Sequence, residues 1–381
     1  MTENERIVAN AKAGDPAAQE MVALSFEAAK QPQEAAGWMS RAAAGGKASA
    51  VGKLGLWELV GYGLPRAPAQ GVAKLDKAAA ANDAFALHVA SVVHAAGIGT
   101  TSDLGKALGC LVRLADMGES RAACQLALMS RSGPALAQAA RLGSGVAQLF
   151  MRGREDLQGD VDWRALAASI DLTPFVSPIV RMPEREEPPI WLVENLLEPW
   201  ICDYVIAMSA PVLTRGKVLD ETGGESVRQE RSNTVMNFGL VDSDVILELV
   251  NLRLAAAAGM PPENAEALGV LHYAVGERYA PHVDYIPETL QNAEQLRLRG
   301  QRVRTLLVYL NDGFEGGATE FPHLKVAYKP PRGCALIFDS VKQDGSVDPM
   351  TLHAGASPTA GQKWVISKWF RNKALRPAET A

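Results

Sequence analysis

Small and apolar side chains recur at helical spacing through the first 150 residues. The recurring marks are Gly14, Gly46, Asn82 and Gly118, and four residues after them stand Ala18, Ala50, Ala86 and Ala122. A shorter unit follows at Gly143, Ala147 and Met151. Side chains four residues apart share one face of a helix, and Gly or Asn between such stripes is typical of a helix C-terminus. These units predict helix pairs that bury their stripes by stacking, an α-solenoid. A non-repetitive bundle of Ala-rich helices is the alternative.

The pattern changes in the second half of the chain. Short apolar or alternating runs, bounded by Gly, Pro and Asp, occur at 190–193, 270–273, 305–310, 334–338 and 364–370. Such runs are typical of β-strands. Two further stretches, about 199–210 and 243–258, have helical character. The second half is therefore predicted to be a β-rich sandwich or barrel with helices on one side.

Prolines separate the two patterns. Those between 159 and 189 are expected to interrupt any helix there: Pro174, Pro178, Pro183, Pro188 and Pro189. We therefore predict an α-helical repeat domain over 1–158, a Pro-rich connection over 159–189 and a β-rich domain over 190–375.

Composition and charge exclude several classes of protein. The 381 residues are 48% hydrophobic and 21% charged, which is ordinary for a folded chain. The net charge of −5 argues against a nucleic-acid partner. No run reaches the about 18 apolar residues of a membrane span, so no membrane partner is expected. The N-terminus lacks the pattern of a secretory signal, and the four cysteines form no C-x-x-C pair. We expect a cytoplasmic protein with reduced thiols.

Three residues form a candidate metal site. His282 and Asp284 stand two residues apart in an alternating segment, so a strand would turn both toward the same face. His353 follows far along the chain in the run Leu-His-Ala-Gly at 352–355. Two imidazoles and a carboxylate leave coordination positions open, the arrangement of non-haem Fe(II) oxygenases. Catalytic zinc accepts the same donors, so a zinc hydrolase is the rival interpretation.

Lys363 bears on that choice. It opens an apolar run, where partial burial is expected, and a buried ammonium requires an anionic partner. A dicarboxylic co-substrate could chelate iron at one end and place its other carboxylate against Lys363. A surface lysine at a strand end is the alternative.

The second half resembles a known family in these and other motifs. The matching text lies at 273–284, 300–312, 314–322, 331–338, 352–355 and 361–369. In this order and spacing, region 190–372 resembles the catalytic domain of the prolyl 4-hydroxylase type of Fe(II)/2-oxoglutarate-dependent dioxygenases. The N-terminal units resemble Sel1-like repeats, which are relatives of the tetratricopeptide family.

The resemblance implies a double-stranded β-helix, or jelly-roll, fold and a set of site residues. Its Fe(II) ligands, which are also the catalytic residues, would be His282, Asp284 and His353. Its 2-oxoglutarate-binding residues would be Lys363, Tyr273, Thr319 and Tyr309. Trp369 would pack under the pocket. O2 is the second co-substrate, and L-ascorbate is an expected reductant.

The expected function is hydroxylation of a prolyl or other residue in a protein or peptide, with release of succinate and CO2. The helical repeats are candidates for binding that substrate, because solenoids present extended concave surfaces. One alternative is a hydroxylase of a free amino acid or other small molecule whose repeats serve oligomerisation or partner binding. Another is an inactive scaffold. Two long polar segments, 214–231 and 286–302, flank the site in sequence, and we expect at least one to close over substrate.

Overall fold

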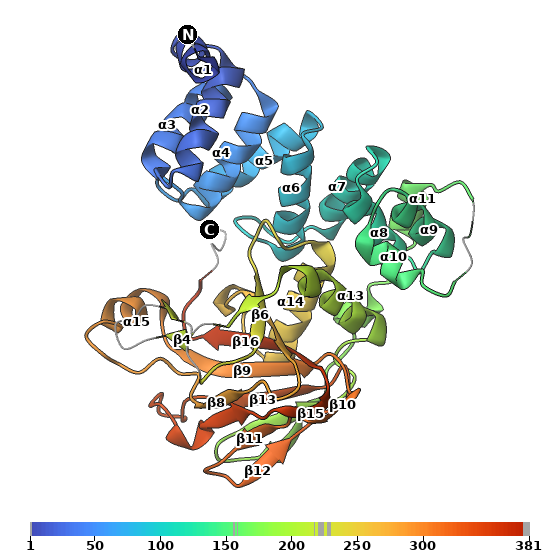
Figure 1. Cartoon of the computed structure of the whole chain (residues 1–381), viewed down its shortest axis with the longest axis vertical. Helices are drawn as coiled ribbons and strands as arrows, with labels where there is room; N and C mark the ends of the chain where they lie inside the picture. The colour runs from blue at the N-terminus through green and yellow to red at the C-terminus, as the bar shows by residue number, and fades with distance from the viewer. Residues whose placement is uncertain are drawn as a thin grey trace. The chain divides into compact units, whose positions relative to one another are not determined.

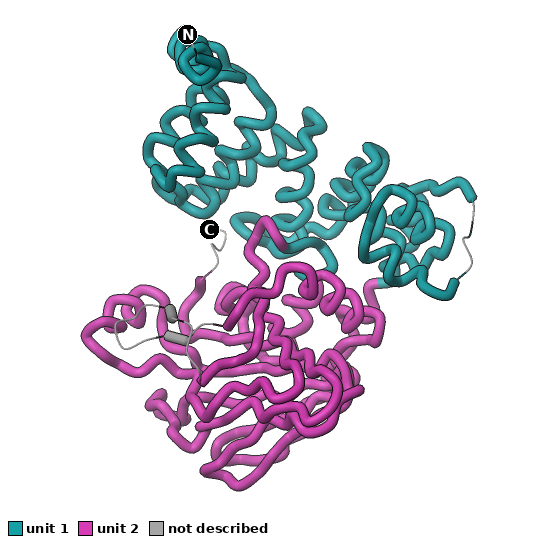
Figure 2. Tube along the Cα trace, in the orientation of Figure 1, with its two compact units in different colours: residues 1–171, 243–248, 377–381 teal, residues 172–242, 249–376 magenta. Residues whose placement is uncertain are grey.

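A computed structural model of the chain describes residues 2–154, 157, 159–216, 218–219, 225–226 and 230–375. They divide into two units, which Figure 2 distinguishes by colour. The described residues of the first unit lie within Met1–Asp171 and Ser243–Glu248, and those of the second within Leu172–Asp242 and Leu249–Arg376. The boundaries expected from the sequence, at 158 and 190, stay predictions.

The first unit contains a succession of helices, and from α1 to α10 each packs on the next (Figure 1). The series is α1 (Glu3–Lys12), α2 (Pro16–Ala28), α3 (Pro32–Ala44), α4 (Ala48–Val60), α5 (Pro68–Ala80), α6 (Ala84–Ala96), α7 (Leu104–Asp116), α8 (Ser120–Met129), α9 (Gly133–Arg141) and α10 (Gly145–Phe150). Helix α11 (Trp163–Ala168) packs on α7 and α8. The predicted helical-repeat architecture is confirmed.

The residues that mark the repeats end helices, as their spacing predicts. All have positive φ angles, from 60° at Asn82 to 101° at Gly14, and each follows the last turn of a helix. This left-handed conformation suits Gly and Asn because other side chains are strained there. The alanines four residues later are buried. Small side chains at these positions allow successive helices to approach closely.

Helices α4 and α5 show how close the approach is. A Cβ atom on Gly55 would lie 2.7 Å from the carbonyl oxygen of Gly71, and one on Gly71 would lie 2.5 Å from that of Gly55. The two helix backbones therefore touch where both residues lack a side chain.

The second unit is built from antiparallel sheets. The largest described sheet has the order β1-β2-β13-β9-β16-β7-β6-β3, and a smaller one has the order β12-β11-β14-β8. Pairs β10-β15 and β4-β5 complete the described sheets. The strands are β1 (Met182–Arg185), β2 (Ile190–Val193), β3 (Thr214–Arg215), β4 (Val218–Leu219), β5 (Glu225–Ser226), β6 (Thr234–Phe238), β7 (Leu268–Tyr273), β8 (Tyr279–His282), β9 (Arg302–Tyr309), β10 (Phe314–Gly316), β11 (Thr319–Phe321), β12 (Val326–Tyr328), β13 (Ala335–Asp339), β14 (His353–Gly355), β15 (Pro358–Gly361) and β16 (Lys363–Arg371).

Alternation along these strands produces the core. A buried cluster fills the space between the larger and smaller sheets, and its members include Leu307, Tyr309, Phe321, Phe338 and Val365. The sandwich confirms the predicted jelly-roll fold.

Helices cover the other face of the larger sheet (Figure 1). They are α13 (Pro199–Ser209) and α14 (Val245–Ala258), close to the predicted bounds. From β16, the fully buried Lys368 donates to the side-chain oxygen of Asn251 on α14, 2.7 Å away. The remaining helices of the unit are α12 (Thr173–Val176), α15 (Ala293–Arg299) and the 3-10 helices η1 (Ala210–Val212), η2 (Pro262–Asn264) and η3 (Pro349–Thr351).

Two short helices lie between 159 and 189, where the prolines are expected to interrupt any helix. Helix α11 ends before the first of these prolines, and Pro174 lies in the first turn of α12. Proline is tolerated there because a first-turn N–H has no partner within the helix.

Two other sequence observations concern the chain as a whole. No helix in the described part of the chain has both the length and the hydrophobicity of a membrane span. The four cysteines are free, and burial raises the pKa of the Cys124 thiol to about 12. A thiol with so high a pKa is unreactive at neutral pH.

The repeat geometry predicts opposite effects for two glycine substitutions near one helix. Gly118→Ala places a side chain at φ 84°, just beyond α7, and should lower the free energy of unfolding by about 1 kcal/mol. Gly109→Ala lies within α7, where a Cβ meets no atom within 4 Å, and should raise it by about 0.5–1 kcal/mol. Urea unfolding followed by far-ultraviolet circular dichroism measures both. Shifts of the same sign would contradict this description of the repeats.

Candidate active site

Pairing between β8 and β14 brings the two candidate histidines together. The strands are antiparallel, and their register places His282 opposite His353, with ring centroids 4.4 Å apart. Asp284 lies two residues beyond His282. Its carboxylate oxygens are 3.7 Å from Nε2 of His282 and 3.5 Å from Nε2 of His353. One ligand atom from each residue lies within 4.8 Å of the other two.

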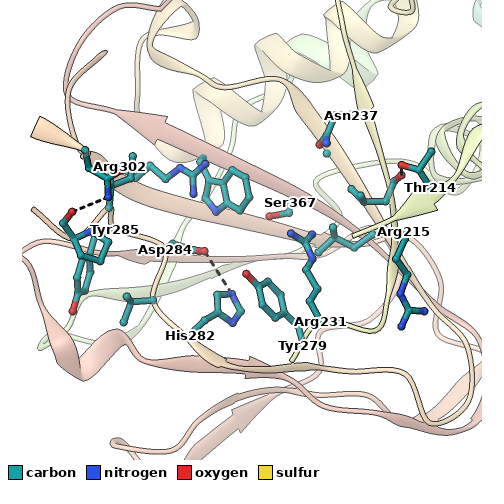
Figure 3. Close-up of a pocket in the computed structure, with 18 of the residues that line it drawn as sticks. Thr214, Arg215, Arg231, Asn237, Tyr279, His282, Asp284, Tyr285, Arg302 and Ser367 are labelled. Carbon is teal, nitrogen blue, oxygen red and sulfur yellow. Dashed lines mark hydrogen bonds and ion pairs between the residues drawn. The ribbon is translucent and has the colours of Figure 1, made fainter. Parts of the chain in front are cut away.

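Asp284 reaches this position differently from the sequence-based expectation. Strand β8 ends at His282, so Asp284 is not the next inward residue of a strand but lies in a bend after it. The bend turns the carboxylate toward His282, as Figure 3 shows. The convergence expected for the three residues is present, although strand alternation is not its cause.

Backbone carbonyls fix both imidazole rings. Nδ1 of His282 lies 2.9 Å from the carbonyl oxygen of Ala280, and Nδ1 of His353 lies 3.0 Å from that of Thr351. Because a carbonyl only accepts hydrogen bonds, each Nδ1 carries the proton. Each Nε2 is then left with a lone pair on the side of Asp284, which is the form in which histidine binds a metal.

The charge states also suit a cation. Burial and the neighbouring His353 lower the pKa of His282 to about 3, so this imidazole is neutral near pH 7. Burial acts to raise the pKa of Asp284, but His353, His282 and a hydrogen bond from Thr305 outweigh it and hold the pKa below its usual value. Two imidazoles beside an ionised carboxylate are the donor set that Fe(II) takes in oxygenases, so these residues fit that metal.

Lys363 is the first residue of β16 and is buried, with 2% of its surface exposed. Its Nζ lies 4.9 Å from the ring centroid of Tyr273 and 5.0 Å from that of Tyr309. No carboxylate of the described residues lies within 4.0 Å of this ammonium group. Burial, followed by the nearby Lys329, lowers the pKa of Lys363 to about 7. A buried ammonium group that lies over aromatic rings and has no ion pair with a described carboxylate fits an anionic ligand.

The other residues expected at the co-substrate site surround Lys363. Tyr273 pairs with it across β7 and β16, and Tyr309 and Thr319 are joined by a hydrogen bond of 2.8 Å between their hydroxyl groups. Burial raises the pKa of Tyr309 to about 12, so its hydroxyl remains protonated. Tyr273, Thr319 and Lys363 line a narrow cavity with all three candidate metal ligands.

A larger cavity, of about 630 Å³, shares His282 and Asp284 with the narrow one. Trp369 lines both cavities, and the guanidinium of Arg302 stacks 3.8 Å from the centroid of its ring. The ring of Tyr279 stacks on that of His282 with centroids 3.5 Å apart. Figure 3 shows Arg302, Tyr279 and His282 around the cavity.

Both long polar segments contribute to the lining of this cavity. The segment 286–302 supplies Ile286, Pro287, Thr289, Asn292 and Arg302, and the segment 214–231 supplies Thr214, Arg215 and Arg231. The middle of the segment 286–302 folds into α15. Residues 217, 220–224 and 227–229 of the segment 214–231 lie outside the described residues. Closure of either segment over substrate stays a prediction.

Two supporting residues were not expected from the sequence. Thr305 donates a hydrogen bond of 2.7 Å to Oδ2 of Asp284. Gly355 lies against Tyr273, because a Cβ atom at this glycine would be 2.9 Å from the tyrosine hydroxyl oxygen. Alternation along β9 is a signal for Thr305, since this residue shares the inward face with Leu307 and Tyr309. No local signal identifies Gly355.

Comparisons with known proteins agree with this geometry. Residues 268–371 match the family model of the 2OG-Fe(II) oxygenase superfamily. The chain is 35% identical over 206 residues to Probable prolyl 4-hydroxylase 8 of Arabidopsis thaliana, a match that covers 48% of this chain and 69% of the relative. Prolyl 4-hydroxylase 1 of the same plant is 34% identical over 202 residues, covering 49% of this chain and 70% of the relative.

Among solved structures, a Sel1 repeat protein from Oxalobacter formigenes is also similar. It shares 25% identity with a TM-score of 0.35, and the match covers 41% of this chain and 73% of that protein.

The hydrogen bond from Thr305 predicts an effect on metal binding. Thr305→Val keeps the shape of the side chain but removes the donor, and we expect about a 10- to 100-fold loss of Fe(II) affinity. Thr305→Ser retains the hydroxyl and should lose much less. Anaerobic Fe(II) titration measures both variants. Equal affinity of the valine variant and the unaltered protein would show that this hydrogen bond does not support the site.

Proposed function

Because the chain belongs to the prolyl 4-hydroxylase family of 2-oxoglutarate- and Fe(II)-dependent oxygenases, we propose that it hydroxylates prolyl residues of a protein or peptide. Family membership makes it a 2-oxoglutarate-dependent dioxygenase. The observation that carries the proposal is the convergence of His282, Asp284 and His353 beside the buried ammonium of Lys363. The names of the relatives support a prolyl substrate.

In this proposal Nε2 of His282, Nε2 of His353 and the Asp284 carboxylate hold Fe(II). Bound Fe(II) supplies O2 activation, which couples decarboxylation of 2-oxoglutarate to succinate and CO2 with insertion of one oxygen atom into a substrate C–H bond. The chain's own residues fix the donors before the metal arrives. The carbonyls of Ala280 and Thr351 set the two rings, and Thr305 orients the carboxylate.

Lys363 is proposed to bind the distal carboxylate of 2-oxoglutarate, with Tyr273, Tyr309 and Thr319 around it. A charge-assisted hydrogen bond between ammonium and carboxylate is strengthened by burial, because water does not compete for either group. The proposed ligand also supplies a carboxylate in direct contact with Lys363, which forms no ion pair with a carboxylate of the described residues. One end of the co-substrate is thereby oriented while the other remains available to the metal.

The larger cavity is proposed to hold the substrate. The rings of Tyr279 and Trp369 line it and offer apolar faces to a prolyl ring while reducing the access of water. We further propose that the helical repeats bind the same protein or peptide, that L-ascorbate serves as reductant and that the protein is cytoplasmic. The free cysteines support the last of these proposals.

The direct test joins two measurements on one reaction. The protein with Fe(II), O2 and 2-oxoglutarate is incubated with a library of proline-containing peptides and, separately, with free amino acids. Succinate release is quantified, and mass spectrometry locates any gain of one oxygen atom. His282→Ala and Asp284→Ala should each abolish succinate release, because each removes a proposed metal ligand. His272→Ala is the matched control, since His272 lies on β7 and is not among the residues lining either cavity.

Three other outcomes of this test would each change a different part of the proposal. Retained turnover in the Asp284→Ala variant would overturn the assignment of the metal ligands. Oxygen added to free amino acids but to no peptide would replace the proposed substrate class by a small molecule. Absence of succinate under all conditions would favour an inactive scaffold.

The depressed pKa of Lys363 predicts that 2-oxoglutarate binding depends on pH. The ammonium form is favoured by the bound dianion, so above about pH 7 binding takes up a proton. The affinity for 2-oxoglutarate should be nearly constant below the pKa of Lys363. It should fall as the pH rises above that pKa, by up to about tenfold per pH unit. Titrations between about pH 6 and pH 9, with Mn(II) preventing turnover, measure this dependence. Lys363→Arg should give a flatter profile, and identical profiles would contradict the role of the lysine.

A further inference from the structure

The larger cavity carries an excess of positive charge. Three arginines line it, Arg215, Arg231 and Arg302, while the only carboxylate among its described lining residues is Asp284. That carboxylate belongs to the proposed metal site. The chain as a whole has a net charge of −5, so this lining departs from the rest of the molecule. A cavity with this balance attracts anionic groups.

Two of the three arginines are engaged by the wall of the cavity. Arg302 makes a two-pronged ion pair with Glu266, with distances of 2.7 Å and 2.8 Å, and stacks on Trp369. Arg231 is buried, donates to the side-chain oxygen of Asn233 at 3.1 Å and lies over the ring of Tyr279. These contacts hold both side chains in place.

Arg215 is different. It lies on β3, an edge strand of the larger sheet, and 48% of its side chain is exposed. Its Nη1 is 3.6 Å from Oε1 of Glu277, within reach of an ion pair but longer than a good hydrogen bond. The other oxygen of Glu277 is held by the backbone N–H of Ala274 at 2.9 Å. Glu277 therefore cannot easily move closer without giving up that bond.

Such an exposed ion pair contributes little free energy to stability. Arg215 can therefore leave Glu277 and bind the carboxylate of a ligand at little cost. A carboxylate that enters the cavity would meet the guanidinium fork of Arg215 and, with good geometry, accept two hydrogen bonds from it. Figure 3 shows His282, Tyr279, Arg231 and Arg215 in that order across the view. The guanidinium of Arg215 therefore lies apart from the proposed metal ligands. A residue bound there would be some distance along the substrate from the reacting one.

We propose that Arg215 determines specificity by binding an acidic side chain of the peptide substrate, so that the enzyme prefers prolines with a nearby Asp or Glu. This inference rests on the proposed function and adds the chemical class of the peptide. Arg215 acts on substrate binding and takes no part in holding Fe(II) or 2-oxoglutarate.

The test uses one proline-containing peptide into which Glu, Gln or Lys is placed at each flanking position in turn. Binding is measured by fluorescence anisotropy, and kcat/KM by succinate release. For the unaltered protein, the best Glu peptide should bind about tenfold more tightly than its Gln counterpart. Arg215→Gln should remove this advantage while leaving the Gln peptide and the KM for 2-oxoglutarate unchanged. Arg215→Glu should reverse it and favour Lys.

Arg185→Gln is the matched control, because Arg185 lies on β1 at the opposite edge of the same sheet. It should retain the full preference for Glu. Equal binding of Glu and Gln peptides, or a preference that survives Arg215→Gln, would overturn the inference even if the peptides are hydroxylated. Binding that prefers Glu through Arg215 without any hydroxylation would instead overturn the proposed function alone.

Discussion

The site depends on the antiparallel register between β8 and β14. This register sets His282 opposite His353, and a slip of one residue in either strand would turn one imidazole to the other face of the smaller sheet. The carbonyls that orient the rings belong to the same chain segments, two residues before each histidine. Position and orientation of the donors therefore follow together from backbone hydrogen bonding, and the bend after β8 adds Asp284.

The two buried charged groups of the site, Asp284 and Lys363, differ in how their charge is compensated. Asp284 has a hydroxyl donor and two imidazoles within reach. Lys363 has aromatic rings, and none of the described carboxylates forms an ion pair with it. A buried ammonium without a counter-charge costs stability, and such costs are tolerated where a ligand supplies the missing charge. The core of the sandwich thus holds a preformed place for an anion beside a preformed place for a cation.

Much of this arrangement was predictable because its signals are local. The repeat marks are Gly or Asn because each occupies a left-handed position after a helix. The strands are visible as alternating or continuously apolar runs. The prediction failed where tertiary contacts determine the position or the role of a residue. Asp284 lies beyond its strand, and the roles of Thr305 and Gly355 depend on residues distant in sequence. Local patterns carry no information about such pairings.

The central claim is that His282, Asp284 and His353 bind one ferrous ion. Crystals grown with Fe(II) and 2-oxoglutarate without oxygen, with anomalous diffraction recorded at the iron absorption edge, test it most directly. The account predicts a single strong anomalous peak bonded to Nε2 of both histidines and to the Asp284 carboxylate, with a 2-oxoglutarate carboxylate against Lys363. A peak elsewhere, or none at these three side chains, would contradict it.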